Sequence, residues 1–347
     1  MSGDRGHVSA GRSAYNPGMI EWDRGLRVGS GGIYLDSRIP RECSFVSHAH
    51  SDHIAAHNCA IATQQTFDLA RLRTTFGTEI PLAFGVTHTH PEGVLRLHSA
   101  GHVLGSAMIH MSTDSGTLLY TGDFKLRPSL TVPHADPVPA DLLVMETTYG
   151  KPMFRFPPWR QVADQLVELV DAALASGVQP IVMGYALGKA QEIVRIITEA
   201  GFPVTEHGAV NNLSDVYERH GVSLGARRRY AAADFKGPRA IPLEERGVIV
   251  APPNVARSGF VEHFEKKLTI MCSGWSLLSG AKYRYGVDHV LPLSDHADFD
   301  ELMELVERVN PKKVLTLHGF SEFADHLRAR GIDATTAKPD PQLRLFD

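Results

Sequence analysis

The chain has 347 residues and a formal net charge of −4, and 43% of its residues are hydrophobic and 21% charged, as in an ordinary globular protein. This length fits two lobes or one large α/β unit, and the small negative charge excludes an overall basic surface, so any polyanion must be bound by local groups. No apolar run is long enough to span a bilayer, and the three cysteines form no C-x-x-C pair. These features argue against a membrane partner, a disulfide framework or a thiolate zinc site, and they favour a cytoplasmic location.

Short strands separated by Gly and Pro are predicted through the first half of the chain. The predicted strands cover residues 26–28, 33–36, 43–47, 60–62, 94–97, 107–112, 117–121 and 142–146. A helix is predicted over 66–74, and another is expected to begin near Ile54. The first 18 residues are rich in Gly, Ser and Arg without periodicity, so we expect a loose tail there.

From Pro158 onward the pattern changes to alternating helices and strands, which is typical of βαβ units. Helices are predicted over 162–173, 188–199 and 213–220, and strands over 180–185, 204–207, 248–251 and 268–272. The closing part is predicted to hold strands 289–293 and 314–318 around a helix. Asp298 is the expected N-cap of that helix, with Glu301 three residues on.

The run from His48 to His53 contains three imidazoles and a carboxylate directly after an apolar strand. Neutral imidazole and carboxylate are ligands that zinc prefers, and His48 and His50 leave the same side of an extended segment. A lone His is more often a surface or core residue, and the chain has 18 of them. The pair His88 and His90 lacks a following Asp-His and is a poor ligand set by comparison. The first cluster predicts a metal site.

Further ligand residues lie at predicted strand ends beside glycine: His102 between Gly101 and Gly105, and Asp123 after Gly122. Asp36 ends its strand in the same manner. Each alone is easily an ordinary turn residue, but the three together with the His48–His53 run predict a shared two-metal site.

These motifs resemble the metallo-β-lactamase fold, and further ones resemble its β-CASP nucleases. Met145-Glu146-Thr-Thr-Tyr149-Gly150 is similar to a Glu-Ser-Thr-Tyr-Gly motif of that family, and Ala186-Leu-Gly-Lys189-Ala-Gln-Glu is similar to Ala-Leu-Gly-Arg-x-Gln-Glu. Ser294-Asp-His296-Ala-Asp298 is similar to Ser-Ala-His-Ala-Asp, and Leu317-His318-Gly319 to a closing Val-His-Gly. The matches run in family order over most of the chain.

The resemblance implies an α/β fold, an αββα metallo-β-lactamase sandwich with an inserted β-CASP lobe. We predict a loose tail over 1–18, the first part of the sandwich over 19–156, the inserted domain over 157–280 and the closing part over 281–347.

The resemblance also implies two Zn²⁺ per chain, with Mn²⁺ as an alternative metal. His48, His50 and His102 would hold one ion, Asp52, His53 and His318 the other, Asp123 would bridge them, and Asp36 would orient ligand imidazoles. Hydroxide activated by two metals would attack phosphorus, and His296, oriented by Glu146, would act as general acid. The expected catalytic residues are therefore His296, Glu146 and Asp52.

The expected function is that of a nuclease releasing 5′-phosphate ends. RNA is favoured as substrate, because in the resembled family a His at the position of His318 accompanies RNA-cleaving members. A DNA exonuclease of DNA repair or ligation is the alternative, and a catalytically silent β-CASP scaffold subunit a further one. Lys189 and Ser294 are candidate phosphate contacts, the run Arg227–Arg229 is a candidate polyanion path, and a homo-oligomer is left open.

Overall fold

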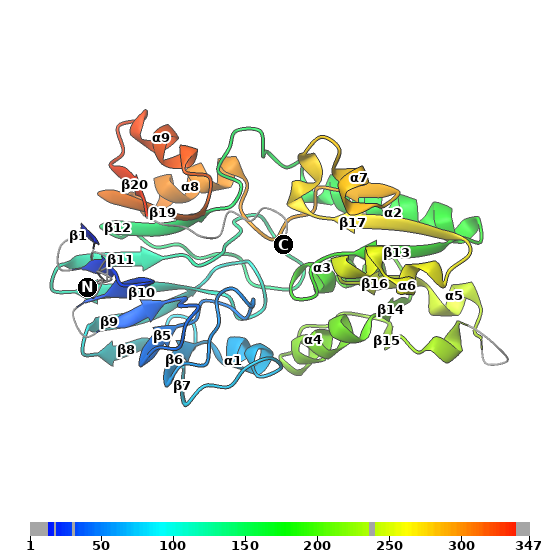
Figure 1. Ribbon diagram of the computed structural model, residues 1–347, viewed down its shortest axis with the longest axis horizontal. Helices are drawn as coiled ribbons and strands as arrows, with labels where there is room; N and C mark the ends of the chain where they lie inside the picture. The colour runs from blue at the N-terminus through cyan, green and yellow to red at the C-terminus, as the bar shows by residue number, and fades with distance from the viewer. Residues whose placement is uncertain (1–12, 17–18, 30–31, 236–239, 338–347) are drawn as a thin grey trace, which may run out of the picture.

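The computed structural model describes residues 13–16, 19–29, 32–235 and 240–337 and contains three β-sheets. Figure 1 shows an elongated molecule in which two sheets occupy one half and the third sheet, with its helices, the other. Among the described residues, no helix combines the length and the apolar character needed to cross a bilayer.

The first sheet has seven strands in the order of the chain, and its last four are parallel. Its strands are β1 Ser13–Asn16, β2 Ile20–Trp22, β3 Leu26–Val28, β4 Ile33–Leu35, β5 Cys43–Phe45, β6 Cys59–Ala62 and β7 Thr78–Pro81.

The second sheet also has seven strands, in the order β20-β19-β12-β11-β10-β9-β8, and β11, β12, β19 and β20 run parallel. Its strands are β8 Thr87–His90, β9 Gly93–Ser99, β10 Ala107–Thr113, β11 Gly116–Tyr120, β12 Leu142–Thr147, β19 Lys313–Gly319 and β20 Ala334–Thr336.

A hydrophobic core fills the space between these two sheets. Alternation along β10 shows how it forms: Ile109 and Met111 face the core shared with the first sheet, whereas Met108 faces the opposite side. Helices cover both outer faces, α1 (Gln64–Ala70) on the first sheet and α8 (Phe299–Val309) with α9 (Glu322–Arg328) on the second. The predicted αββα sandwich is confirmed.

The third sheet has six parallel strands in the order β15-β14-β16-β13-β17-β18. They are β13 Gln179–Met183, β14 Val204–Glu206, β15 Arg227–Arg229, β16 Val248–Ala251, β17 Lys267–Cys272 and β18 His289–Leu291. Both faces are apolar, as parallel sheets require: Val182 packs under the long helices, and Ile181 and Met183 face the other cluster. The long helices are α2 Trp159–Ala175, α3 Lys189–Glu199 and α4 Gly208–Arg219.

The short helices of this half are α5 Leu243–Arg246, α6 Gly259–Glu262, α7 Ala281–Tyr285 and the 3₁₀ turns η1 Ala232–Asp234, η2 Pro253–Arg257 and η3 Gly274–Leu277. The third sheet continues past residue 280 to β18, so the predicted boundary at 280 falls between two of its strands. The domain limits themselves stay predictions.

The N-cap prediction for α8 is confirmed. The carboxylate of Asp298 accepts the backbone N–H of Glu301 at 3.0 Å, and the carboxylate of Glu301 accepts the backbone N–H of Asp298 at 3.0 Å.

Two local predictions were wrong. The expected helix near Ile54 does not form: residues 54–58 have no regular structure and lead into β6, and the His57 carbonyl accepts a hydrogen bond from Gly77. Within the predicted tail, residues 13–16 form β1, paired with β2, while residues 1–12 and 17–18 lie outside the described residues.

Candidate metal centre

The predicted site residues follow or end strands whose carboxyl ends meet at one edge of the sandwich. Parallel pairing explains this arrangement, because β4 runs parallel to β5, and β11 runs parallel to β12, which in turn runs parallel to β19. The strand ends supply Asp36 after β4, His48 to His53 after β5, His102 after β9, Asp123 after β11, Glu146 in β12 and His318 in β19.

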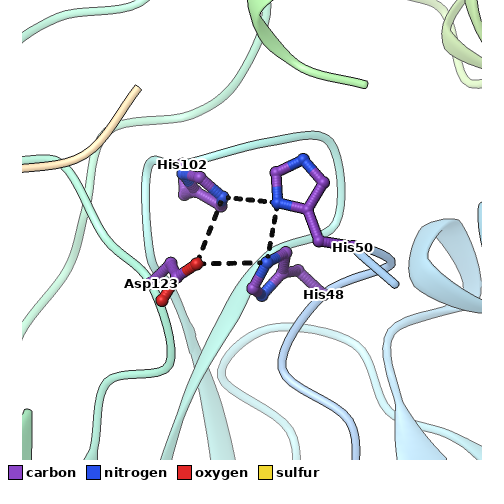
Figure 2. Close-up of side chains that lie close together, drawn as sticks. All are labelled: His48, His50, His102 and Asp123. Carbon is purple, nitrogen blue, oxygen red and sulfur yellow. Dashed lines mark hydrogen bonds and ion pairs between the residues drawn. The ribbon is translucent and has the colours of Figure 1, made fainter. Parts of the chain in front are cut away.

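Four of these side chains converge on one point, as Figure 2 shows. His48 Nε2 lies 3.0 Å from His50 Nδ1, and His102 Nε2 lies 3.2 Å from the same atom. The Asp123 carboxylate lies 3.4 Å from His48 Nε2 and 3.8 Å from His102 Nε2. Ligands placed about 2.0–2.1 Å from a tetrahedral zinc lie about 3.3 Å apart, so these separations fit one ion.

The outer nitrogen of each imidazole already has a hydrogen-bond acceptor. His50 Nε2 faces the carbonyl of Leu187 at 3.1 Å, and His102 Nδ1 faces the carbonyl of Asp295 at 2.8 Å. His48 Nδ1 faces the Ser47 hydroxyl at 2.9 Å, and that hydroxyl itself donates to Asp36. We therefore assign the ring protons to the outer nitrogens. Each of the three inward nitrogens then carries a lone pair, and none of them carries a proton to donate. A cluster of this kind binds a cation.

Protons are poor candidates for that cation. Burial lowers the pKa of His48 well below its ordinary value, and burial lowers the pKa of His50 as well. Burial, followed by the neighbouring His296, lowers the pKa of His102 to about 3. The imidazoles are therefore neutral at neutral pH, which is the form that binds a metal ion.

A second group of predicted ligands adjoins the first. His53 Nε2 lies 3.4 Å from the Asp123 carboxylate and 3.7 Å from that of Asp52, and the ring of His318 is centred 5.5 Å from the ring of His53. Asp123 thus stands between the two groups, at the position expected of a bridging ligand.

Asp36 holds the second group in place. Its carboxylate accepts hydrogen bonds from the Ser47 backbone and hydroxyl, from the Tyr120 hydroxyl at 2.7 Å and from His53 Nδ1 at 2.8 Å. With Nδ1 bound to Asp36, His53 presents Nε2 to Asp52 and Asp123. This is the orienting position predicted for Asp36.

His296 lies beside the first group, with its ring centre 4.7 Å from that of His102. Its Nδ1 faces both oxygens of Glu146, at 3.0 and 3.1 Å. Burial alone would lower the pKa of His296, but the charges of Glu146 and Asp123 outweigh burial and raise the pKa to about 9. Glu146 is itself held by the backbone N–H of Phe124 at 2.8 Å.

The two predicted phosphate contacts have other partners. Lys189 is only 2% exposed, and its ammonium lies 2.5 Å from the carboxylate of Asp295, so it is not presented to a substrate. The Ser294 hydroxyl is buried and hydrogen-bonded to the backbone of His296. We correct both assignments, because a buried side chain that is already bonded inside the protein gains little by exchanging that bond for a phosphate.

Three residues of the site were not predicted as such: Asp295, Leu187 and Tyr120. Asp295 stands next to His296 and carries a carboxylate, which was a usable signal. Leu187 acts through its carbonyl, and Tyr120 pairs with a residue 84 positions away, so the sequence held no sign of either.

The chain is similar to known proteins, both over its closing part and over most of its length. A family model described as the Zn-dependent metallo-hydrolase RNA specificity domain matches residues 280–339. A probable DNA ligase from Opitutus terrae is 40% identical over 95% of this chain and 32% of its own length, so the chain spans about a third of that relative. RNase aCSPSF2 from Saccharolobus solfataricus is 24% identical over 86% of this chain and 74% of its own.

One solved structure, a protein of unknown function from Enterococcus faecalis V583, matches with a TM-score of 0.58 over 86% of this chain and 79% of that chain. At 16% identity it shows the fold alone. The sandwich, the His and Asp cluster at its edge and the relatives of the whole chain lead to one conclusion: the chain has the metallo-β-lactamase fold and is similar to the β-CASP nucleases of that fold.

Proposed function

We propose that the protein hydrolyses phosphodiester bonds of nucleic acid at a site that holds two zinc ions. The observation that supports this proposal is the set of three inward imidazole lone pairs with Asp123, directly beside the His296–Glu146 pair. A metal-binding cluster next to a carboxylate-oriented imidazole is what metal-assisted hydrolysis needs.

In this proposal His48, His50, His102 and Asp123 hold the first ion, and Asp52, His53 and His318 hold the second together with Asp123. When bound, such ions stabilise the charge on phosphate oxygens and lower the pKa of water. Asp36 fixes the ring of His53 through Nδ1.

His296 supplies the proton that the departing oxygen needs. Glu146 accepts the Nδ1–H of His296 and favours the protonated ring, so the proton available for transfer is at Nε2. In a cleavage that leaves 5′-phosphate ends, this proton goes to the 3′-oxygen of the departing nucleoside.

Two substrates are candidates. RNA is supported by His318, by the family domain and by the RNase-named relative. DNA is supported by the probable DNA ligase, which is more similar to this chain than that RNase is. The chain would then act on DNA ends, as one part of a system that joins them.

Tyr185 is suited to hold a nucleobase near the site. It is 52% exposed, and it lies two residues before Leu187, whose carbonyl contacts His50 at 3.1 Å. Partial burial and then the nearby Tyr285 and the carboxylates of Asp295 and Asp52 raise its pKa. An exposed ring beside a metal cluster can stack on an unpaired base without reading its sequence.

The deciding experiment uses purified protein and end-labelled RNA and DNA, each single- and double-stranded, with and without a chelator. We expect chelator-sensitive cleavage of one of the four substrates, with 5′-phosphate products. No cleavage of any substrate by protein that retains two zinc ions would contradict the proposal. Less than one zinc per chain would instead support the scaffold alternative.

A further inference from the structure

The half of the molecule built on the third sheet contacts the first ligand group directly. The carbonyl of Leu187, in the turn between β13 and α3, accepts the Nε2–H of His50 at 3.1 Å. The carbonyl of Asp295, in the segment that follows β18, accepts the Nδ1–H of His102 at 2.8 Å. Two of the three imidazoles of this group are therefore oriented by backbone that lies outside the ligand loops.

A buried ion pair joins these two carbonyl-bearing segments. Lys189 begins α3, two residues after Leu187, and its ammonium lies 2.5 Å from the carboxylate of Asp295. The side chains are 2% and 6% exposed. The pair closes a ring of contacts that runs from His50 through Leu187, Lys189 and Asp295 to His102, whose Nε2 lies 3.2 Å from His50 Nδ1.

Apolar packing fixes the same loops to the third-sheet half. Ala49, Val103 and Leu104 are sequence neighbours of the ligands, and they are buried in the hydrophobic cluster of α2, α3 and α4. The backbone N–H of Leu104 donates to the hydroxyl of Tyr217 in α4 at 3.0 Å. A Cβ at Gly188 would lie 2.3 Å from Val103, so the start of α3 touches the His102 loop without spare room.

From these contacts we propose that Lys189 and Asp295 are positioning residues for the metal centre, and that the docking of the third-sheet half and metal affinity are coupled. The inference rests on the proposed metal site. Removing one member of a buried pair leaves a charge without a partner and allows its segment to shift. The carbonyls of Leu187 and Asp295 would then no longer hold His50 and His102 in the ligand geometry, and outer partners of this kind typically contribute about 10- to 100-fold in metal affinity.

The test measures zinc affinity by competition with a chromophoric chelator. We expect Lys189→Met to weaken the tightest zinc binding about 10- to 100-fold, and Lys189→Arg to keep most of the affinity. The double variant Lys189→Met with Asp295→Asn carries no unpaired charge and keeps the fold testable, and it should weaken zinc binding as well. Circular dichroism establishes that each variant is folded.

Glu192→Gln is the matched control. Glu192 lies in the same helix, and its carboxylate is paired with the ammonium of Lys125 at 3.0 Å, with side chains 4% and 1% exposed. This pair also joins α3 to the sandwich, but Glu192 contributes no carbonyl to a ligand imidazole. We expect the zinc affinity of the Glu192→Gln variant to stay within about threefold of that of the unchanged protein.

Zinc binding must in turn stabilise the docking of the third-sheet half, because linkage between the two is reciprocal. Chelation of zinc should accelerate amide hydrogen exchange in residues 187–193 and 293–297 of the unchanged protein, and much less in β10. Folded Lys189→Met and double variants with unchanged zinc affinity would overturn the inference, as would an equal loss in Glu192→Gln. Protein that binds no zinc overturns the metal site too, whereas zinc binding without hydrolysis contradicts only the proposed function.

Discussion

The ring nitrogen that each histidine turns inward decides the chemistry of the site. His48 and His102 present Nε2 to the cluster, whereas His50 presents Nδ1, because the carbonyl of Leu187 engages its other nitrogen. At His296 it is Nδ1 that is engaged, by Glu146. In the proposed function, histidines thus have two roles, metal ligand and proton donor, and the hydrogen-bond partner of each ring sets which role it takes.

The role of His296 is tested by His296→Ala. We expect turnover to fall about 10²-fold or more, because the departing oxygen loses its proton donor, while zinc content is unchanged. Turnover and zinc content are measured on the same preparation, with His88→Ala, in strand β8 at the sheet edge, as control. Lost zinc would show that His296 is a ligand, and unchanged turnover that it is not the acid.

The role of Tyr185 is tested with substrates that lack one base. Tyr185→Ala should raise KM for single-stranded substrate about 5- to 150-fold, which corresponds to one lost base stack of about 1–3 kcal/mol, and Tyr185→Phe should change it little. With an abasic nucleotide at the stacked position, the Ala variant and the unchanged protein should have equal KM values. A penalty that persists on every abasic substrate would mean that Tyr185 supports the fold rather than a base.

At the scale of elements, the site depends on how strands end. Asp36 and His318 both have left-handed backbone, with φ of 46° and 45°, although neither is glycine. Gly319 follows His318 with φ of 151°, and a Cβ there would lie 1.9 Å from the carbonyl of Thr147. Strained backbone of this kind persists only where surrounding structure fixes it, and here it turns two side chains toward the cluster.

The turn before α3 makes a further testable case. Gly188 and Gly201 have nearly equal φ, 88° and 89°, but only Gly188 has a close neighbour, Val103. We expect Gly201→Ala to lower the free energy of unfolding by about 1–2 kcal/mol from backbone strain alone. Gly188→Ala should lower it by about 1–3 kcal/mol more, because its ψ of −73° is unfavourable for a residue with a Cβ and because that Cβ would overpack against Val103. Denaturant titration measures both, and equal losses would mean that the contact with Val103 relaxes freely.

For the whole molecule, metal and fold stability are linked, because the proposed ligands come from segments as distant as His48 and His318. Zinc at about 100 times its dissociation constant should stabilise the folded chain by about 2.7 kcal/mol. We expect a chelator to lower the unfolding temperature of the unchanged protein by several degrees and to have little effect on His48→Ala. Equal unfolding temperatures of the unchanged protein with and without chelator would contradict a shared site.

At the scale of the whole molecule, ion pairs within the protein neutralise part of the predicted polyanion path. Arg227, in the predicted polyanion path, lies 2.7–2.8 Å from Glu206, Asp215 and Glu218 on its own lobe. With a net charge of −4, the chain has no surplus of cations for a long nucleic-acid path. In the proposed function, contacts to substrate are therefore expected at the cluster and its rim, where metal charge and base stacking supply the binding.

Much of the fold was predictable because its signals are local. The apolar strands of the sandwich core and the N-cap of α8 follow from neighbouring residues. Strands β7, β8, β15 and β20 were missed because they are short and partly exposed, and partners hold them in the sheet. The false helix near Ile54 has the opposite cause, since contacts of His57 with Arg41 and Gly77 override local propensity.

The candidate ligands came from the sequence alone: residue types and spacings pointed to the His48–His53 run, His102 and Asp123, and the resemblance to a known family added His318. Only the tertiary structure decided which nitrogen of each ring turns inward and which groups hold it there. It also decided that Lys189 pairs with Asp295 instead of facing a substrate. The physical reason is separation along the chain: a hydrogen bond between His102 and Asp295 joins residues 193 positions apart, and no local pattern records it.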